Sequence, residues 1–374
     1  MLYLEDSAAI KEAAACLKRM FSKHLGKYIK LFFLEEDLDL KNLDVSPLLK
    51  TRILRNVGKK MRANVQVFPL HGFFICTDFL YSKHRRVGKI FKTLKDGVWA
   101  ILPDESPVIA QSAIVKPGDK VLDLATGSGI IALFCARVAE KVIATDINPR
   151  AIHFAKFNAI LNSLEDKIEF RLGDLFEPVK GEKFDLIIWN GPTVAVPNVP
   201  EKYPTYCFGG MDGAHFTKRF INQALNFLKE GGRLQWYDCA VGDKDLPVSM
   251  RYLEKKWKNT NLKVSYYSLT KKPVSLKKAF HFYEKWNLKS DKFKTPLAVK
   301  SVTKKEELHW HNWLEDRGYT HVFFGLVTCT KSREFQLKTQ YPEKDIRVDK
   351  YLTKYWLFRS YATIRRWLAK LWKI

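Results

Sequence analysis

The chain has 374 residues, 46% of them hydrophobic, so it can bury a sizeable core and is long enough for two or three domains. Its six cysteines are scattered without a Cys-x-x-Cys pair, which argues against a disulfide framework and favours a reducing, cytoplasmic location. The first residues lack the basic and apolar regions of a signal peptide, and no apolar stretch has the length of a membrane span, so we expect neither secretion nor a transmembrane segment.

The formal net charge of +24 is distributed unevenly along the chain. Residues 1–110 carry 19 Lys and Arg against 12 Asp and Glu, residues 111–240 carry 15 against 15, and residues 241–374 carry 30 against 13. A neutral middle with basic flanks predicts that the chemistry lies in the centre, with RNA or a membrane surface bound by the flanks. A solvated cationic surface without a partner would have the same charge distribution. Net charge does not distinguish this alternative from flanks that bind an anionic partner.

The N-terminal part reads as a helical cap followed by short strands. Apolar positions recur at helical spacing over residues 7–21 and 46–61, with Ser46 as N-cap and Pro47 as first helical residue of the second segment. Short aromatic and β-branched runs follow at 64–70, 72–80 and 97–102. We therefore expect residues 1–105 to form a helical domain with a small β connector.

From Gly118 onwards, strands and helices alternate. We expect strands at 120–124, 141–146, 168–174, 184–190, 232–240, 263–269 and 321–330, and helices at 130–139, 149–162, 214–230 and 247–258 and around 309–316. Nearly all-apolar strands in this order predict an α/β fold, with a doubly wound, mostly parallel sheet covered by helices on both faces. This core should span residues 106–335, with a Lys-rich insertion at about 285–308.

A glycine-containing loop joins the first strand of this core to its helix. Gly127-Ser128-Gly129 allows the backbone to approach a ligand at the helix N-terminus, because a side chain there would block it. The string Gly127-x-Gly129-x-x-Ala132 also satisfies the dinucleotide-binding fingerprint. The loop by itself leaves S-adenosylmethionine (SAM) and a nicotinamide cofactor open.

Three acids at successive strand ends favour SAM. Asp123 suits the ammonium or amide groups of an amino acid, Asp146 can accept from two ribose hydroxyls, and Asp174 can accept from an adenine amino group. Each acid alone is more commonly a helix cap or a solvated loop residue. Together they converge on the sheet edge at which open α/β folds bind ligands.

The runs VLDLATGSG, ATDINP, RLGDLF and FDLIIWNGPT resemble class I SAM methyltransferases of the "small domain" group, which includes protein-glutamine N5- and ribosomal-RNA guanine N2-methyltransferases. The resemblance covers about residues 100–240 and implies a Rossmann-like core with a seven-stranded sheet. It places Asp123, Gly127 and Gly129 at the methionine end of SAM, Asp146 at the ribose, and Asp174 with Leu175 at the adenine. It also assigns Ala125, Thr126, Ile147 and Asn190 to the cofactor site; many relatives have Gly in place of Ala125.

The fourth strand of that group ends in Asn-Pro-Pro followed by an aromatic residue. Here it ends in Asn190-Gly191-Pro192-Thr193, so Asn190 and the Gly191 carbonyl can accept the protons of a planar amino group while Pro192 stiffens the turn. Thr193 lacks the aromatic ring, which Tyr203, Tyr206 or Phe208 from the following loop could supply. Asp212 lies in a Gly-Gly-x-Asp-Gly segment that resembles the glutamine methyltransferases, and it is equally suited to cap the helix at residue 214.

Two further features carry weaker predictions. His309 and His311 lie on different faces of a helix without a third ligand, so we expect no metal. The tail at 336–374 ends in a basic amphipathic helix from Tyr351, suited to a membrane surface or to docking on the protein's own core.

The residues thus favour an enzyme that transfers a methyl group to nitrogen on a macromolecular acceptor, either RNA or a protein amide. A small-molecule or lipid methyltransferase, which could act at a membrane surface, is the nearest alternative. A nicotinamide-dependent oxidoreductase and a non-catalytic RNA- or membrane-binding protein are more remote ones.

Overall fold

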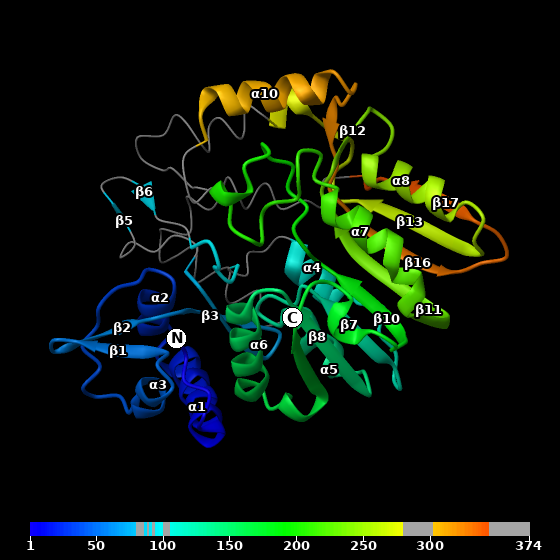
Figure 1. Ribbon diagram of the computed structural model, residues 1–374. Coiled ribbons are helices and arrows are strands. Elements are labelled where there is room, and N and C mark those ends of the chain that lie inside the picture. Colours follow the sequence, from blue (N-terminus) through cyan, green and yellow to red (C-terminus); the bar gives the residue numbers. More distant parts are fainter. Residues whose placement is uncertain (80–85, 88–89, 92–93, 100–104, 280–301, 344–374) are drawn as a thin grey trace.

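A computed structural model of the chain describes residues 1–79, 86–87, 90–91, 94–99, 105–279 and 302–343. Its centre is a sheet of eight strands in the order β17-β13-β16-β11-β10-β7-β8-β9 (Figure 1). These strands are β7 (Lys120–Leu124), β8 (Lys141–Asp146), β9 (Ile168–Leu172), β10 (Phe184–Trp189), β11 (Leu228–Asp238), β13 (Leu262–Ser268), β16 (Gly325–Lys331) and β17 (Gln336–Gln340). Strand β16 runs antiparallel to both neighbours, and all other neighbouring pairs are parallel. The predicted α/β class is confirmed.

The sheet has one strand more than the seven expected. Strand β17 pairs with β13 at the edge of the sheet, in the segment that we assigned to the tail. Its sequence QLKTQ has no apolar run, because an edge strand is only partly buried. The segment expected as one strand at 321–330 is two: β15 (His321–Val322) leaves the main sheet to pair with β12 (Val241–Gly242) and β14 (Val274–Ser275).

Helices cover both faces of the sheet. Helices α4 (Glu105–Gln111), α5 (Ile130–Ala136) and α6 (Pro149–Leu161) lie on one face, α7 (His215–Gln223) and α8 (Val248–Trp257) lie on the other, and α10 (Lys304–Glu315) packs on β12 and β15. Strand β10 is buried on both sides, with Leu186 and Ile188 in one core and Ile187 and Trp189 in the other. This double burial explains its nearly continuous apolar sequence.

Helix α7 ends earlier than predicted. The helix expected at 214–230 gives way to a 3-10 turn at Ala224–Phe227, and β11 begins at Leu228. Leu228 pairs with Phe184 of β10, so sheet pairing replaces the helix over its last residues. Local periodicity could not indicate this partner, which is distant in sequence.

The N-terminal part is not all helical. Its elements are α1 (Ser7–Lys23), α2 (Leu25–Phe32), α3 (Ser46–Lys50), the antiparallel pairs β1 (Leu54–Val57) with β2 (Lys60–Ala63) and β3 (Gln66–Leu70) with β4 (Phe73–Thr77), and a two-residue pair, β5 (Arg86–Val87) with β6 (Ile90–Phe91). The helix expected at 46–61 is wrong beyond Lys50, because Arg52 and Gly58 have left-handed backbones with φ of 60° and 58°. Its N-cap is Val45, one residue before the predicted Ser46.

The strands expected at 64–70 and 72–80 are confirmed as β3 and β4, although β4 ends at Thr77. The third expected run is not a strand over residues 97–99, and residues 100–102 lie outside the described part. Figure 1 shows α1 beside α6, so the N-terminal elements pack against the face of the sheet covered by α5 and α6.

Asn158 of α6 and Asn162, the C-cap of this helix, form strand-like hydrogen bonds with the backbone of β4. Asn158 Oδ1 accepts from the Cys76 N–H at 2.8 Å, and its Nδ2 donates to the Cys76 carbonyl at 2.9 Å. One turn later, Asn162 makes the same pair of hydrogen bonds with Phe74, at 2.9 and 2.8 Å. Asn158 Nδ2 also donates to the Ser128 carbonyl at 2.8 Å. The buried amide of Asn158 therefore ties the N-terminal part to the glycine loop.

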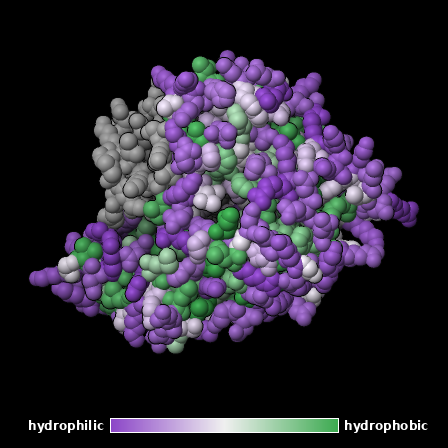
Figure 2. Space-filling model, in the orientation of Figure 1, coloured by the Kyte–Doolittle hydropathy of each residue, from purple (hydrophilic) through white to green (hydrophobic). Residues whose placement is uncertain are grey.

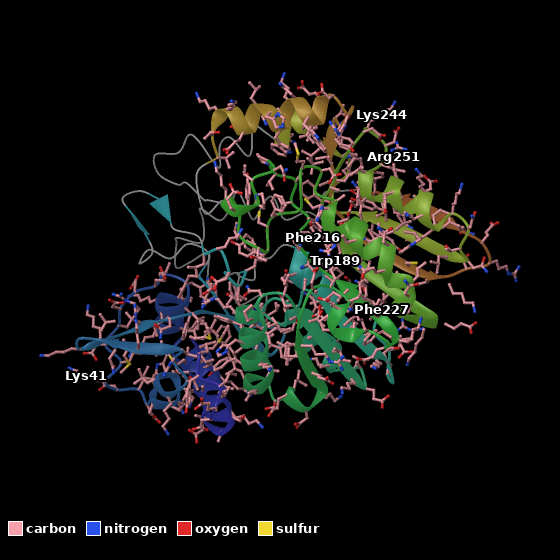
Figure 3. The ribbon with its side chains drawn as sticks, viewed as in Figure 1. Lys41, Trp189, Phe216, Phe227, Lys244 and Arg251 are labelled. Atoms are coloured by element: carbon pink, nitrogen blue, oxygen red, sulfur yellow. The ribbon has the colours of Figure 1, made fainter. Side chains whose placement is uncertain are left out.

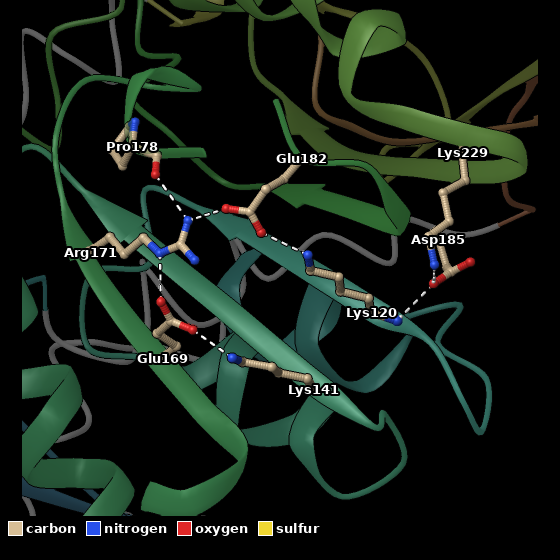
Figure 4. A network of polar contacts seen from close by, with 8 residues as sticks. All are labelled: Lys120, Lys141, Glu169, Arg171, Pro178, Glu182, Asp185 and Lys229. Atoms are coloured by element: carbon tan, nitrogen blue, oxygen red, sulfur yellow. Dashed lines mark hydrogen bonds and ion pairs between the residues drawn. The ribbon is translucent and has the colours of Figure 1, made fainter. Parts of the chain in front are cut away.

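The opposite end of the sheet carries a network of charges (Figure 4). It joins Arg171, which lies further along β9, to residues at or near the amino ends of β7, β8, β9, β10 and β11, namely Lys120, Lys141, Glu169, Glu182, Asp185 and Lys229. The hydrogen bonds from Lys141 and Arg171 lower the pKa of Glu169 to about 2. The amino edge is thus occupied by mutually paired charges, and the carboxyl edge is left for a ligand.

Most of the surface visible in Figure 2 is hydrophilic, with hydrophobic residues gathered where α6 lies in Figure 1. Within the described part of the chain, no helix has both the length and the apolar character needed to cross a bilayer. The amphipathic tail from Tyr351 and most of the Lys-rich insertion fall on residues 280–301 and 344–374, outside the described residues.

Candidate active site

The glycine loop after β7 is shaped by backbone conformations that suit glycine. Gly127 has φ of 56°, and no atom lies within 4 Å of the position that a Cβ would occupy. Gly129 has φ of 82°, and a Cβ there would lie 3.1 Å from the Ala155 Cβ of α6. Ala125, where many relatives have Gly, also adopts a left-handed backbone with φ of 57°. The loop is therefore open at Gly127 and closely packed at Gly129.

Asp123 lies at the end of β7 and is fully buried. Its Oδ2 accepts from the Thr126 hydroxyl at 2.7 Å and from the Ala132 N–H at 3.0 Å, which fixes the loop on α5. Its Oδ1 has no hydrogen-bond partner among the described residues. Burial raises the pKa of Asp123 to about 7, although these hydrogen bonds lower it. A positively charged ligand group nearby would favour the carboxylate.

Asp146 ends β8 and also contacts the loop. Its Oδ2 accepts from the Gly127 N–H and its Oδ1 from the Asn148 N–H, both at 2.9 Å. Burial raises the pKa of Asp146, and these backbone hydrogen bonds oppose the shift. The next residue, Ile147, is 57% exposed, although large apolar side chains are more often buried. A carboxylate and an exposed apolar side chain thus lie side by side at this strand end.

Asp174 has a partner that the sequence did not indicate. The guanidinium of Arg219 on α7 donates to its carboxylate, with Nη2 2.5 Å from Oδ2. Arg219 also lies over the ring of Phe216, 5.7 Å from its centroid. Leu175 follows Asp174 with a left-handed φ of 46° and is half-buried. Spacing along the chain could not place Arg219 here, because α7 reaches this edge only through the fold.

Asn190 follows β10 and is hydrogen-bonded to the start of α4. Its Nδ2 donates to the Ser106 hydroxyl at 3.1 Å, and its Oδ1 forms no hydrogen bond with the described residues. Ser106 is buried and was not predicted as a site residue. No motif pointed to it, since it lies 84 residues before Asn190.

The Trp189 indole leaves room only for glycine at position 191. A Cβ at Gly191 would lie 2.4 Å from Nε1 of the Trp189 indole, so no larger residue fits beside this ring. Trp189 stacks on Phe220 of α7 with 5.3 Å between centroids and 12° between planes. Figure 3 shows Trp189, Phe216 and Phe227 along α7. The departure from Pro at position 191 therefore accompanies a tryptophan at the end of the strand.

The Gly-Gly-x-Asp-Gly segment packs against the catalytic strand end. A Cβ at Gly209 would lie 2.5 Å from the carbonyl carbon of Thr193, and one at Gly213 would lie 2.6 Å from the Thr193 oxygen. Thr193 is only 3% exposed beneath this segment. Contact between Thr193 and the acceptor stays a prediction, for a residue that the following loop approaches closely along its backbone.

The other predicted acceptor residues fare differently. Tyr203 is buried, and Asp212 accepts from the Ala214 N–H at 2.9 Å and pairs with Lys218 of α7 at 2.6 Å. Ala214 is the N-cap of α7 and no side chain caps this helix, so the N-cap role expected for Asp212 is wrong. Contact of Tyr203 and Asp212 with an acceptor stays a prediction. Tyr206 is half-buried, and its ring lies 4.8 Å from that of Trp99. Phe208, the third residue expected to supply a ring, is half-buried as well.

The loop between Val194 and Gly213 is fixed from two sides. Lys95 Nζ donates to the carbonyls of Pro200 and Tyr203, at 2.6 and 2.7 Å. On the other side, Lys202 pairs with Glu306 at 2.6 Å and the Trp310 indole of α10 donates to the Met211 carbonyl at 2.8 Å. Contacts with Lys95 and with α10 thus hold this loop in place.

Within the described residues, no three His, Cys, Asp or Glu side chains lie close enough together to hold a metal ion. The same edge offers three features to a ligand with an amino-acid end. These are the unpaired Asp123 oxygen, the open space at Gly127 and the exposed side chain of Ile147. These features match a ligand with charged, polar and apolar parts. A doubly wound sheet with a glycine loop at this edge is typical of α/β proteins that bind a nucleotide-containing cofactor.

The family model described as "Methyltransferase domain" matches residues 115–318, more than half of the chain. The chain belongs to this methyltransferase family and is a SAM-dependent enzyme. The choice left open at the glycine loop is thereby decided for SAM, and the oxidoreductase alternative is wrong.

Two relatives with methyltransferase names agree with this class. The chain is 37% identical over 149 residues to a proposed protein N5-glutamine methyltransferase of Methanocaldococcus jannaschii, covering 38% of this chain and 74% of that protein. It is 29% identical over 222 residues to the release factor glutamine methyltransferase of Aquifex aeolicus, covering 56% and 75%. The solved ribosomal protein L11 methylase of Lactobacillus delbrueckii subsp. bulgaricus is 18% identical, with 61% and 77% covered and a TM-score of 0.33.

Proposed function

We propose that the enzyme methylates the side-chain amide nitrogen of a glutamine in a protein. The observation that carries the proposal is Asn190 at the end of β10, whose amide is held by Ser106 with Oδ1 left for another partner. The names of the relatives from M. jannaschii and A. aeolicus, both glutamine methyltransferases, support the same acceptor.

Residues along the carboxyl edge would hold SAM. Asp123 and the loop at Thr126, Gly127 and Gly129 would hold its methionine part, with the unpaired Asp123 oxygen available for the amino group. Asp146 would accept from the ribose hydroxyls. Ile147 and Leu175 would contact the adenine, and Asp174, oriented by Arg219, would accept from its amino group. When bound, SAM supplies a methyl group on a positively charged sulfur.

The strand end would orient the acceptor. Asn190 Oδ1 and the Gly191 carbonyl would accept the two protons of the acceptor NH2 group, which turns the nitrogen lone pair out of conjugation and towards the methyl group. The nitrogen would receive the methyl group that SAM supplies and would give up one of its two protons to solvent. Pro192 stiffens the turn that carries these two oxygens. Tyr206 with Trp99 would provide the aromatic surface that Thr193 lacks.

The acceptor would carry or lie beside an anionic region such as RNA. The basic excess of the two flanks would draw a protein bound to RNA, or RNA itself, to the enzyme. All six cysteines are buried and none of them forms a disulfide, which supports a reducing, cytoplasmic location.

The acceptor can be identified with radiolabelled SAM and fractionated protein, RNA and lipid of the host. We expect label in protein and, after complete enzymatic digestion, N5-methylglutamine by mass spectrometry. A peptide with Asn in place of the labelled Gln is the matched control and should stay unlabelled. Label confined to RNA or lipid would reject the glutamine proposal while leaving the methyltransferase class intact.

Asp146→Ala should weaken SAM binding by at least tenfold. Each charge-assisted hydrogen bond to the ribose contributes about 1.5–3 kcal/mol, and the Gly127 N–H also loses its partner. Calorimetry with SAM measures the change. Asp185→Ala is the control, because Asp185 is paired with Lys229 at the opposite edge of the sheet and should leave SAM affinity unchanged. Equal affinity in both variants would remove Asp146 from the cofactor site.

A further inference from the structure

We propose that Lys95 is a positioning residue that holds the acceptor loop, residues 194–213, against the cofactor end of the sheet. Through it, binding of the cofactor and closure of this loop favour each other. The inference rests on the proposed function only in taking this loop as the one that faces the acceptor. Lys95 belongs to a short linking segment, residues 94–99, which contacts the loop on one side and the cofactor edge on the other.

Lys95 binds the acceptor loop with both its side chain and its backbone. Its Nζ donates to the carbonyls of Pro200 and Tyr203, at 2.6 and 2.7 Å. Its carbonyl accepts from the Thr205 N–H at 2.9 Å and from the Thr205 hydroxyl at 3.1 Å. Two of these bonds have a charged donor, and such bonds are stronger than neutral ones. The part of the loop that leads to Tyr206 is therefore attached to Lys95.

The residue after Lys95 is attached to the cofactor edge. Asn148 Nδ2 donates to the Asp96 carbonyl at 2.9 Å, and Asn148 Oδ1 accepts from the Arg150 N–H at 2.9 Å. A carbonyl can only accept and a backbone N–H can only donate, so these partners assign both ends of the amide. The Asn148 N–H in turn donates to Oδ1 of Asp146, the acid proposed to hold the ribose, at 2.9 Å. A continuous series of hydrogen bonds thus joins Asp146 to the acceptor loop.

A second contact fixes the linking segment to α6. The Val98 N–H donates to Asp78 Oδ2 at 2.8 Å, and the Asp78 N–H donates to the Val98 carbonyl at 3.3 Å. The buried carboxylate of Asp78 is paired with Arg150 in the first turn of α6, the helix that has Asn148 as its N-cap. The segment cannot leave the start of α6 without breaking these bonds, so Lys95 fixes the loop relative to the cofactor edge.

A ligand on Asp146 should therefore make the acceptor loop harder to open. Ribose hydroxyls bound to this carboxylate restrict the turn from Asp146 to Asn148. The hydrogen bonds through Asp96 and Lys95 extend that restriction to the loop, and ordering of one part lowers the entropy cost of ordering the other.

Hydrogen–deuterium exchange of single backbone amides, followed by NMR, tests this without a protein acceptor. The probe is S-adenosylhomocysteine, the demethylated form of the cofactor. At saturation it should slow exchange of the Thr205 N–H about fivefold or more in the wild-type protein. Lys95→Met should speed this exchange about tenfold or more, because the loop loses two bonds to a charged donor. Lys95→Arg can donate to the same carbonyls and should restore most of the protection.

Asn148→Asp separates binding of the ligand from its effect on the loop. Aspartate has the same shape and keeps an oxygen for the Arg150 N–H, but the ionised side chain cannot donate to the Asp96 carbonyl. S-adenosylhomocysteine should still bind this variant, as measured by calorimetry. At saturation it should no longer slow exchange of the Thr205 N–H.

Two controls accompany the variants. Lys183→Met makes the same chemical change at an exposed lysine whose Nζ donates to the Asn226 carbonyl at 2.6 Å, and it should leave Thr205 exchange unchanged. The Gly209 N–H is the reference amide within the loop, because it donates to the Val194 carbonyl at 2.9 Å and not to Lys95. Equal acceleration of Gly209 and Thr205 in Lys95→Met would mean general loosening of the loop and would overturn the positioning role.

The other outcomes are equally distinct. If Lys95→Met leaves Thr205 exchange unchanged, Lys95 does not hold the loop and the inference is wrong. It is also wrong if S-adenosylhomocysteine does not slow exchange in the wild-type protein, or slows it equally in Asn148→Asp. None of these results affects the glutamine acceptor, whereas label confined to RNA or lipid in the labelling experiment would reject that acceptor and leave the exchange results standing.

Discussion

Asn190→Ala should lower turnover by about 10²-fold or more while leaving SAM affinity nearly unchanged. Removing a preorganised polar group at a reacting centre has effects of this size. The SAM contacts proposed for this edge come from the ends of β7, β8 and β9, not from this side chain. The loss should therefore appear in turnover and not in cofactor binding. Turnover is measured with radiolabelled SAM on the protein acceptor identified in the labelling experiment, and SAM affinity by calorimetry.

The control for this variant is Asn222→Ala. Asn222 lies on the exposed side of α7, where its side-chain oxygen accepts from the Tyr252 hydroxyl at 2.8 Å. Neither residue belongs to the proposed site. We expect wild-type turnover in this protein. Turnover of Asn190→Ala at the wild-type rate would mean that nitrogen is not oriented here, and an oxygen or carbon acceptor would become the better hypothesis.

Asn158→Leu should lower the free energy of unfolding by about 3 kcal/mol or more and weaken SAM binding as well. Leucine has a similar shape but leaves the Cys76 N–H, the Cys76 carbonyl and the Ser128 carbonyl without partners, and each unpaired buried group costs about 1–3 kcal/mol. Urea unfolding gives the change in stability. SAM affinity is expected to fall because the Ser128 carbonyl belongs to the glycine loop.

Asn162→Leu provides the matched comparison. It removes the same type of contact to β4, at Phe74, one helical turn away, but has no bond to the glycine loop. It should destabilise the protein and leave SAM affinity of the folded protein unchanged. If both variants lose SAM affinity equally, the effect comes from general loosening of the N-terminal part, and the coupling through Asn158 is refuted.

The order of elements in the core was predictable because its signals are local. Parallel strands buried on both faces have continuous apolar runs, as at Leu186–Trp189, and a ligand-binding loop requires glycine at positions such as Gly127. The predictions of an α/β fold, a methyltransferase and SAM all depended on such patterns. Each needs only residues that are close together in the chain.

The elements that were predicted wrongly depend on contacts between distant residues or on backbone conformations that local patterns do not show. Strand β17 is recognisable only from its pairing with β13, and the end of α7 is decided by the pairing of Leu228 with Phe184. The helix predicted beyond Lys50 is interrupted by backbone conformations that apolar spacing does not reveal.

The sequence by itself determined the fold class, the cofactor and the strand ends that carry Asp123, Asp146, Asp174 and Asn190, because strand polarity places such ends on one edge of a parallel sheet. Only the tertiary structure decided which side chains meet them. Arg219 reaches Asp174 from α7, and Ser106 reaches Asn190 from α4. Contacts of this kind depend on how helices pack across the sheet, and no spacing along the chain encodes that distance or direction.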